Sequence, residues 1–168
     1  MPIKNKIKID SFKIEKMRQS DVQEVLKLAV LAQSNFGVTD TVSPSAFLKE
    51  IYNLMQDCMR FAFVYRSSSN FLFGAFIIKP TTNISAEIKL FLSHPDIAQT
   101  KEMYEEFFKI INASKFGFHI KVLKKRKKFE AYVRFLDALG FSEIESEDER
   151  FLTLRYRKLD KIPIVELL

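Results

Sequence analysis

The sequence predicts an α+β fold in which a mostly antiparallel, mixed sheet is flanked by about four helices. Its length of 168 residues fits one domain, or at most two. Hydrophobic residues make up 47% and charged residues 29%, which is the range of soluble globular chains. Apolar positions switch between strand and helix periods in the order β-α-α-β-β-β-α-β-α-β, without an internal repeat.

Composition excludes several classes of protein. No apolar run reaches the roughly 18 residues of a membrane-spanning helix, and the N-terminal alternation of Lys and Ile lacks the apolar stretch of a secretory signal. Cys58 is the one cysteine, so an intrachain disulfide and a cysteine-based zinc site are excluded, and we expect no metal site. The net charge of +6 permits an anionic partner without requiring one.

The first elements are an arm, a strand and a helix. Residues 1–11 alternate Lys with Ile, and we interpret them as an N-terminal arm. A clearer alternation predicts a strand at 12–17. Residues 20–23, Ser-Asp-Val-Gln, have a capping-box pattern. The apolar spacing behind them predicts a helix over 21–35, which ends at Phe36–Gly37.

A second helix and a hairpin follow. Ser43-Pro44 combines an N-cap residue with proline at the first helical position, and the apolar stripe behind it continues to Cys58. Strands are predicted at 60–66 and 71–79. The Ser-Ser-Ser-Asn turn at 67–70 joins them into a hairpin.

The second half alternates strands with helices. Gly140 stands at the C′ position, where a helix commonly stops. We interpret the acidic stretch 143–149 as the start of the last strand and its turn. The predicted elements are a strand at 84–92, a helix capped by Thr100, a strand at 118–123, a helix at 129–139 and a strand at 151–156.

This order of elements resembles the GNAT superfamily of acyl-CoA N-acyltransferases, and three local patterns agree with it. Arg18-Gln19-Ser20-Asp21 looks like the family's opening between the first strand and the first helix. Phe71-Leu72-Phe73-Gly74 is similar to its third strand, and Leu139-Gly140-Phe141 to its late Gly-Phe signature. The resemblance covers residues 12–157, which implies one GNAT-like domain there, with 158–168 as a C-terminal tail.

The end of the chain carries a second resemblance. Residues 134–141, Arg-Phe-Leu-Asp-Ala-Leu-Gly-Phe, then an acidic turn and the Phe-Leu-Thr-Leu of 151–154, look like small GNAT-like proteins of tailed phages. Some of those are internal core proteins of the virion. This resemblance implies a protein of a phage particle.

The resemblance also implies where acyl-CoA would bind. The family holds the CoA diphosphate on backbone N–H groups at the start of the third helix, with small residues that let the backbone approach. The pattern, aligned at Gln99, places Glu102 and Tyr104 at the two small positions. If a cofactor binds, Gln99, Thr100 and Lys101 would hold it. Otherwise Glu102 in the first helical turn stabilises a helix that binds no anion.

Candidate catalytic residues follow from the same comparison. Glu87 resembles the glutamate base of histone-type members, and a base is needed to take the proton of the attacking amine. Its alternative role is a strand-end carboxylate on a solvated face, paired with Lys89 or with nothing. His94 is a second candidate base. The family's general-acid tyrosine corresponds to Leu136, so Tyr132, one turn earlier, is the remaining candidate acid.

A basic run and an apolar tail are candidate interaction sites. Lys124, Lys125, Arg126, Lys127 and Lys128 follow Lys121 closely, and they either contact nucleic acid or another anion or form a solvated turn that the acidic stretch 143–149 neutralises. The tail is rich in aliphatic residues, which dock on a protein partner or fold back on the domain. They are Ile162, Ile164, Val165, Leu167 and Leu168.

Three functions remain open from the sequence. The first is a non-catalytic structural or interaction component with a degenerate acyl-CoA loop, such as a virion protein, which binds other subunits or itself and needs no cofactor. The alternative is an active acetyl-CoA-dependent N-acetyltransferase, and the third is a nucleic-acid-binding module. We expect the chain in the cytoplasm or in a phage particle.

Overall fold

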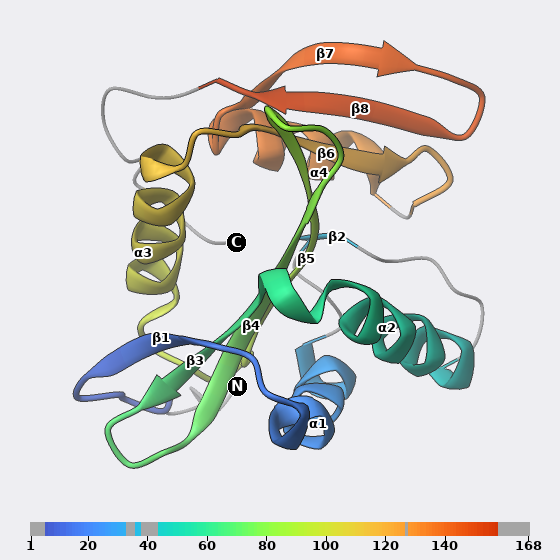
Figure 1. The fold of residues 1–168 in the computed structure, drawn as a ribbon. Coiled ribbons are helices and arrows are strands. Elements are labelled where there is room, and N and C mark those ends of the chain that lie inside the picture. Colours follow the sequence, from blue (N-terminus) through green and yellow to red (C-terminus); the bar gives the residue numbers. More distant parts are fainter. Residues whose placement is uncertain (1–5, 33–35, 38–43, 127, 158–168) are drawn as a thin grey trace, which may run out of the picture. The chain divides into compact units, whose positions relative to one another are not determined.

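The structure is a computed structural model that describes residues 6–32, 36–37, 44–126 and 128–157. The chain forms two compact units, each built from two stretches of sequence (Figure 1). Unit 1 contains Met1–Ile78 and Lys89–Thr100, and unit 2 contains Lys79–Ile88 and Lys101–Leu168. Hydrogen-bonded strands follow the order β1-β3-β4-β5-β6-β8-β7, and β2 also pairs with β5.

Unit 1 combines helices with antiparallel strand pairs. β1 pairs with β3, β3 with β4, and β2 with the end of β5, all antiparallel. Its elements are β1 (Phe12–Lys16), η1 (Gln19–Asp21), α1 (Val22–Ala32), β2 (Phe36–Gly37), α2 (Pro44–Cys58), η2 (Met59–Phe61), β3 (Ala62–Ser67), most of β4 (Leu72–Pro80) and the end of β5 (Ser85–Ser93).

Helices and strands of unit 1 bury two different apolar clusters. α1 and α2 contribute Val25, Leu28 and Met55 to an aliphatic core shared with strands β3, β4 and β5. The second cluster is aromatic, and Tyr65 lies at its centre. Rings of Phe12, Phe73, Phe76 and Phe91 surround the Tyr65 ring at centroid distances of 5.8, 5.9, 5.9 and 6.2 Å. Such pairs add to the stability that burial of the ring area provides.

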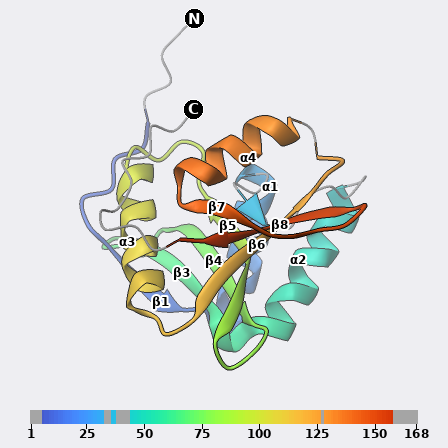
Figure 2. The same ribbon diagram turned by 90° about the horizontal axis from the view of Figure 1, so that it is seen from above.

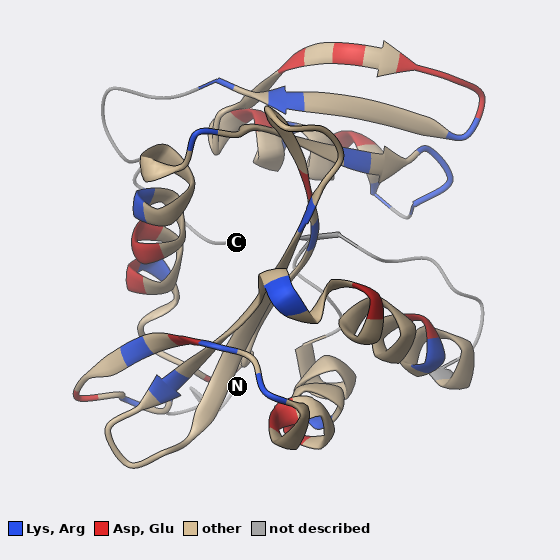
Figure 3. Cartoon of the chain, viewed as in Figure 1, with Lys and Arg blue, Asp and Glu red and all other residues tan. Residues whose placement is uncertain are grey.

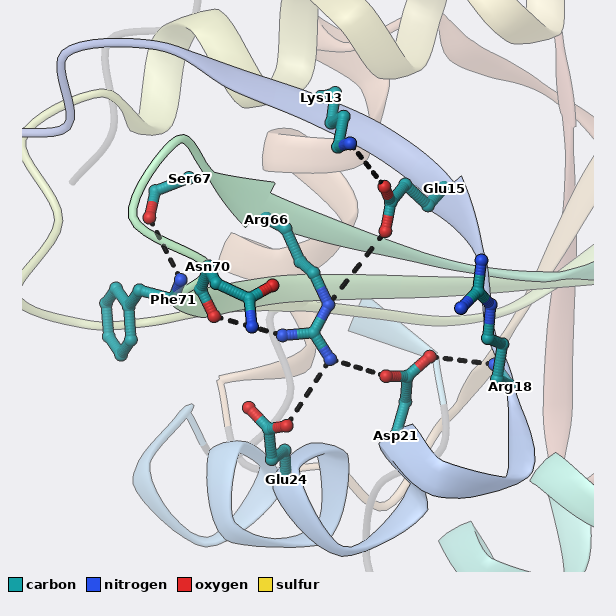
Figure 4. Close-up of polar contacts among 9 residues, drawn as sticks. All are labelled: Lys13, Glu15, Arg18, Asp21, Glu24, Arg66, Ser67, Asn70 and Phe71. Atoms are coloured by element: carbon teal, nitrogen blue, oxygen red, sulfur yellow. Dashed lines mark hydrogen bonds and ion pairs between the residues drawn. The ribbon is translucent and has the colours of Figure 1, made fainter.

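A cluster of charged side chains connects four elements of unit 1 (Figure 4). Arg66, near the end of β3, contacts Asp21 of η1, Glu24 of α1 at 3.3 Å and Glu15 of β1 at 3.9 Å. Its Nη1 also donates to the Asn70 carbonyl at 3.1 Å. The Arg66 and Asp21 side chains are only 11% and 8% exposed. Burial lowers the pKa of Arg66, but the hydrogen bonds to Asp21 and Glu24 outweigh it and raise that pKa overall.

Unit 2 contains a mixed sheet. β5 pairs with β6 in parallel, whereas β8 pairs antiparallel with both β6 and β7. α4 lies beside β7 in both views (Figures 1 and 2). The elements are α3 (Thr100–Ala113), β6 (Gly117–Leu123), α4 (Phe129–Ala138), β7 (Phe141–Glu147) and β8 (Phe151–Tyr156), together with the start of β5.

Tyr156 organises the core of unit 2. Its ring packs on Phe108 of α3 at 5.7 Å and on Phe141 at 5.3 Å, and its hydroxyl donates to the Asn112 Oδ1 at 2.7 Å. The backbone of Gly140 has a φ of +105°, and a Cβ there would lie 2.8 Å from the Tyr156 ring. The glycine therefore allows both the left-handed turn after α4 and the close approach of this ring.

The predicted α+β fold class is confirmed, with corrections to several elements. α2 begins at Pro44 and α4 ends two residues before Gly140, as predicted. Thr100, predicted to cap the third helix, is the first residue of α3, and its hydroxyl donates to the Ile97 carbonyl. The first helix was predicted over 21–35; α1 covers Val22–Ala32, and residues 33–35 lie outside the described residues. Phe36–Gly37, predicted to end that helix, forms strand β2. Asp21, rather than Ser20, caps the first turn, because its Oδ2 accepts the Arg18 N–H at 2.8 Å.

The acidic stretch 143–149, predicted as the start of the last strand and its turn, contains most of a separate strand, β7. Six of its seven residues are exposed, including Ile144, so the strand shows no buried face and no alternation. Figure 3 shows its acidic residues near the basic segment after β6. Glu147 of β7 pairs with Lys124 at 2.6 Å. Among the described residues, no helix is both long and apolar enough to cross a membrane.

Asp148 forms the turn between β7 and β8. Its Oδ1 accepts the backbone N–H groups of Arg150 and Phe151, each at 2.7 Å. The bond from Phe151, followed by that from Arg150, lowers the pKa of Asp148 below its ordinary value. The charged carboxylate therefore stabilises this turn.

We predict that Arg66→Met destabilises the chain by roughly 2–4 kcal/mol, because it leaves the Asp21 carboxylate buried without its cation. Arg66→Met/Asp21→Asn should recover part of the loss, since the remaining group is then neutral. Urea unfolding of the natural chain and of the single and double variants, fitted with one shared m value, measures the coupling free energy between Arg66 and Asp21. Strictly additive losses would contradict the role given to the pair.

We predict that the stabilising effect of Asp148 depends on pH. A carboxyl whose folded pKa is depressed stabilises the fold above its unfolded pKa of about 3.9, and this effect disappears as the pH falls through the folded value. The difference in unfolding free energy between the natural chain and Asp148→Asn should be constant above about pH 5 and shrink at lower pH. A difference that does not change down to pH 3 would contradict this assignment.

Candidate functional site

The segment before α3 is the candidate cofactor loop, and it is bonded to the chain's own N-terminal arm. Ile7 and Ile97 form a parallel bridge. The Ile7 N–H donates to the Asp96 carbonyl, and the Ala98 N–H donates to the Ile7 carbonyl at 2.9 Å. All of these residues belong to unit 1. The described part of the predicted arm thus lies along the loop Asp96–Gln99.

Gln99 holds the arm through its side-chain amide. The Ile9 N–H donates to the Gln99 Oε1 at 2.9 Å, and the Gln99 Nε2 donates to the Ile9 carbonyl at 2.8 Å. The amide has a carbonyl and an N–H in one plane, so it bonds Ile9 as a neighbouring strand would. The Ile9 side chain is buried. Both functional groups of the Gln99 amide are therefore occupied within the chain.

The backbone of the loop is also bonded locally. The Asp96 N–H donates to the His94 Nδ1 at 3.1 Å, and the Ile97 N–H donates to the His94 carbonyl at 3.3 Å. With the bond from Ala98 to Ile7, three consecutive backbone N–H groups have acceptors within unit 1. His94, predicted as a possible base, anchors this loop, and its ring contacts Phe71 at 5.7 Å.

The other predicted cofactor residues also have partners within the chain. The Thr100 hydroxyl donates to the Ile97 carbonyl at 3.2 Å, and the Lys101 ammonium lies 3.8 Å from Glu105 one turn along α3. Tyr104, at a position where the family has a small residue, is buried. Glu102 is exposed in the first turn of α3, where its charge favours the positive end of the helix dipole.

Glu87, the predicted base, is a buried carboxylate of unit 2, so the alternative prediction of a solvated strand face is wrong. It lies opposite His119 on the parallel neighbour β6. Its Oε1 is 3.7 Å from the His119 Nε2 and 4.0 Å from the Lys121 Nζ. The Glu87 and His119 side chains are only 9% and 12% exposed. Sequence reasoning missed His119 as a neighbour of Glu87. The two residues are 32 positions apart in the sequence, and only the pairing of β5 with β6 places them side by side.

Tyr132, the predicted substitute acid, lies on α4 among aromatic and basic side chains. The Arg126 guanidinium lies over its ring at 3.7 Å, and its ring stacks on Phe135 at 6.4 Å. Leu136, where the family has its tyrosine, is fully buried. The structure thus places Tyr132 in a cation–π contact with the basic run.

Two residues of the basic run have partners in unit 2. Lys124 pairs with Glu147, and Arg126 covers Tyr132. Lys128, the residue before α4, has a left-handed backbone, with a φ of 55°. Lys127 and the tail residues from Ile162 to Leu168 lie outside the described residues. Within the described residues, no group of three or more His, Cys, Asp or Glu side chains is arranged to hold a metal ion.

Solved structures show which fold the chain has. An acetyltransferase from Thermus thermophilus superposes with a TM-score of 0.60 at 13% identity and covers 88% of this chain and 97% of its own. Ard1 from Thermoplasma volcanium gives 0.59 at 16% identity, covering 89% and 99%. A GNAT-family acetyltransferase from Bacillus cereus gives 0.56 at 10% identity, covering 89% and 99%.

The chain therefore has the GNAT fold. No family model and no curated protein sequence matches it. At identities of 10–16%, likeness to these structures establishes the fold alone.

Proposed function

We propose that this chain is a non-catalytic GNAT-fold protein that acts through interactions with other proteins or with itself. The observation that carries the proposal is the bonding of the Gln99 amide to Ile9 of the N-terminal arm. Related acyltransferases use this loop and helix start for the CoA diphosphate. Here the same loop receives a strand of protein.

The chemistry of the helix start supports this function. A diphosphate carries negative charge, and Glu102 would place a carboxylate beside it. Tyr104 supplies a large side chain where close backbone approach needs a small one. Lys101, the cation nearest to this position in sequence, pairs with Glu105. The helix start is thus stabilised without an anion. A virion of a tailed phage is the assembly that the C-terminal pattern suggests.

We predict that about 1 mM acetyl-CoA does not raise the thermal unfolding midpoint of the chain. A ligand at 100 times its Kd would add about 2.7 kcal/mol, which is a rise of roughly 5–10 °C for a chain of this size. Ile9→Pro removes the N–H that donates to Gln99, and acetyl-CoA should not raise the unfolding midpoint of this variant either. A rise with the natural chain would contradict the proposal. A rise with Ile9→Pro alone would show that the arm, rather than the helix start, excludes the cofactor.

A second candidate function, acyl transfer to an amine, is favoured by the burial of Glu87 beside His119. The attacking amine has to lose a proton, and a buried carboxylate on a strand can accept it. Under this alternative, acetyl-CoA is the cofactor and Glu87 is the catalytic base, with Tyr132 as the remaining candidate acid.

For this alternative, we predict that Glu87→Gln lowers acetyl transfer by about 10²–10⁴-fold without lowering the unfolding midpoint by more than a few degrees. Release of free CoA thiol in the presence of a panel of amines measures the activity. Glu143→Gln, at an exposed position on β7, is the matched control and should leave activity unchanged. Equal activity of the two variants would exclude Glu87 as the base.

A further inference from the structure

The contact between the arm and the loop is made mainly by backbone groups. Two backbone hydrogen bonds involve Ile7, and the Gln99 amide adds a donor and an acceptor for the backbone of Ile9. The one buried side chain of the described arm is that of Ile9, which is 8% exposed, whereas Lys6, Ile7 and Lys8 are exposed. Recognition of this kind depends on an extended backbone and one aliphatic side chain.

The connection between the arm and β1 is short and exposed. Asp10 is a bend, and both Asp10 and Ser11 are solvent-exposed. The Ser11 carbonyl accepts the Ser68 N–H at 3.0 Å, so the arm is fixed to the turn after β3 at its root. Asp10, an exposed bend residue, connects the bonded part of the arm to this fixed root, so β1 does not depend on the bonds between the arm and the loop.

We propose that the loop Asp96–Gln99 is a receiving site for the N-terminal arm of a second copy of this chain. The loop binds the backbone of Ile7 and Ile9, and the Ile9 side chain is buried. The arm of another copy has the same backbone groups and the same isoleucine. Exchange of an identical element between copies is a low-cost route to association, because it makes no new contact and loses none. The inference rests on the proposed function, in which this loop receives protein rather than acyl-CoA.

Concentration determines which arm occupies the loop. A short tether gives the chain's own arm an effective concentration in the millimolar range. Dilute chains therefore keep their own arms, and exchange becomes frequent only at comparable concentrations of chain. Packing inside an assembly provides such concentrations, which agrees with a role as an interaction component.

Disulfide capture tests the exchange in the full-length chain. Residues on bridged strands lie about 5 Å apart, within the Cα range of a disulfide. One preparation carries Ile7→Cys and a second, of different isotopic mass, carries Ile97→Cys. Cys58 is buried and is present in both. The doubly substituted chain, Ile7→Cys/Ile97→Cys, should close an intrachain disulfide when dilute, which verifies the observed geometry.

The two single variants are mixed and oxidised, and the product is analysed by mass spectrometry. We expect a disulfide between position 7 of one chain and position 97 of the other, with a yield that rises at least 10-fold between about 10 μM and 1 mM chain. Gln99→Ala in the receiving chain should lower that yield several-fold. Because Ile97 is buried, a second pair, Lys8→Cys with Ala98→Cys, repeats the test at exposed positions.

A control pair separates exchange from random collision. Ile7→Cys is mixed with Ile84→Cys, since Ile84 is 73% exposed. The proposal would be overturned if both test pairs gave the same disulfide yield as this control pair at every concentration. It would also be overturned if Gln99→Ala left the disulfide yield of the test pairs unchanged. The acetyl-CoA measurement tests the proposed function independently of the disulfide capture. A midpoint rise with normal capture refutes the non-catalytic function, and no rise with no capture refutes only the exchange.

Discussion

The organisation of unit 1 depends on the Arg66 guanidinium. Asp21 is buried at the start of α1, and a buried carboxylate is tolerated only beside a cation or several hydrogen-bond donors. Arg66 supplies the cation from β3, and the Arg18 N–H supplies a donor. This pairing determines where α1 begins relative to β3. α1 then presents Val25 and Leu28 to the aliphatic core.

The loop before α3 is held by hydrogen bonds within the chain. A helix start can receive an anion, or it can be stabilised by the chain's own groups. In this chain, the groups before and at the helix start bond to His94, Ile7 and Ile9, and Glu102 supplies negative charge at the first turn. Solved structures with the same fold at 10–16% identity include acetyltransferases, so the fold is compatible with that activity without requiring it.

Local signals predicted the fold, whereas long-range contacts formed the candidate site. Proline at the start of α2, Thr100 at the start of α3 and Gly140 after α4 are features of neighbouring residues, and their elements were confirmed. β7 was missed because its exposed strand has no alternation, and Glu is uncommon in strands. The Gln99–Ile9 and Glu87–His119 contacts join residues 90 and 32 positions apart, and no local pattern of residue types specifies such pairs.

The Gln99 amide also restricts which residues can occupy that position. A carboxylate of the same length would place a second acceptor against the Ile9 carbonyl, and Asn would be one methylene too short to present the same plane. Lys or Arg would offer donors without the acceptor that the Ile9 N–H needs. During evolutionary divergence, glutamine at this position and an extended arm should therefore be kept or lost together. Their joint occurrence would distinguish arm-binding chains of this fold from those whose loop serves another ligand.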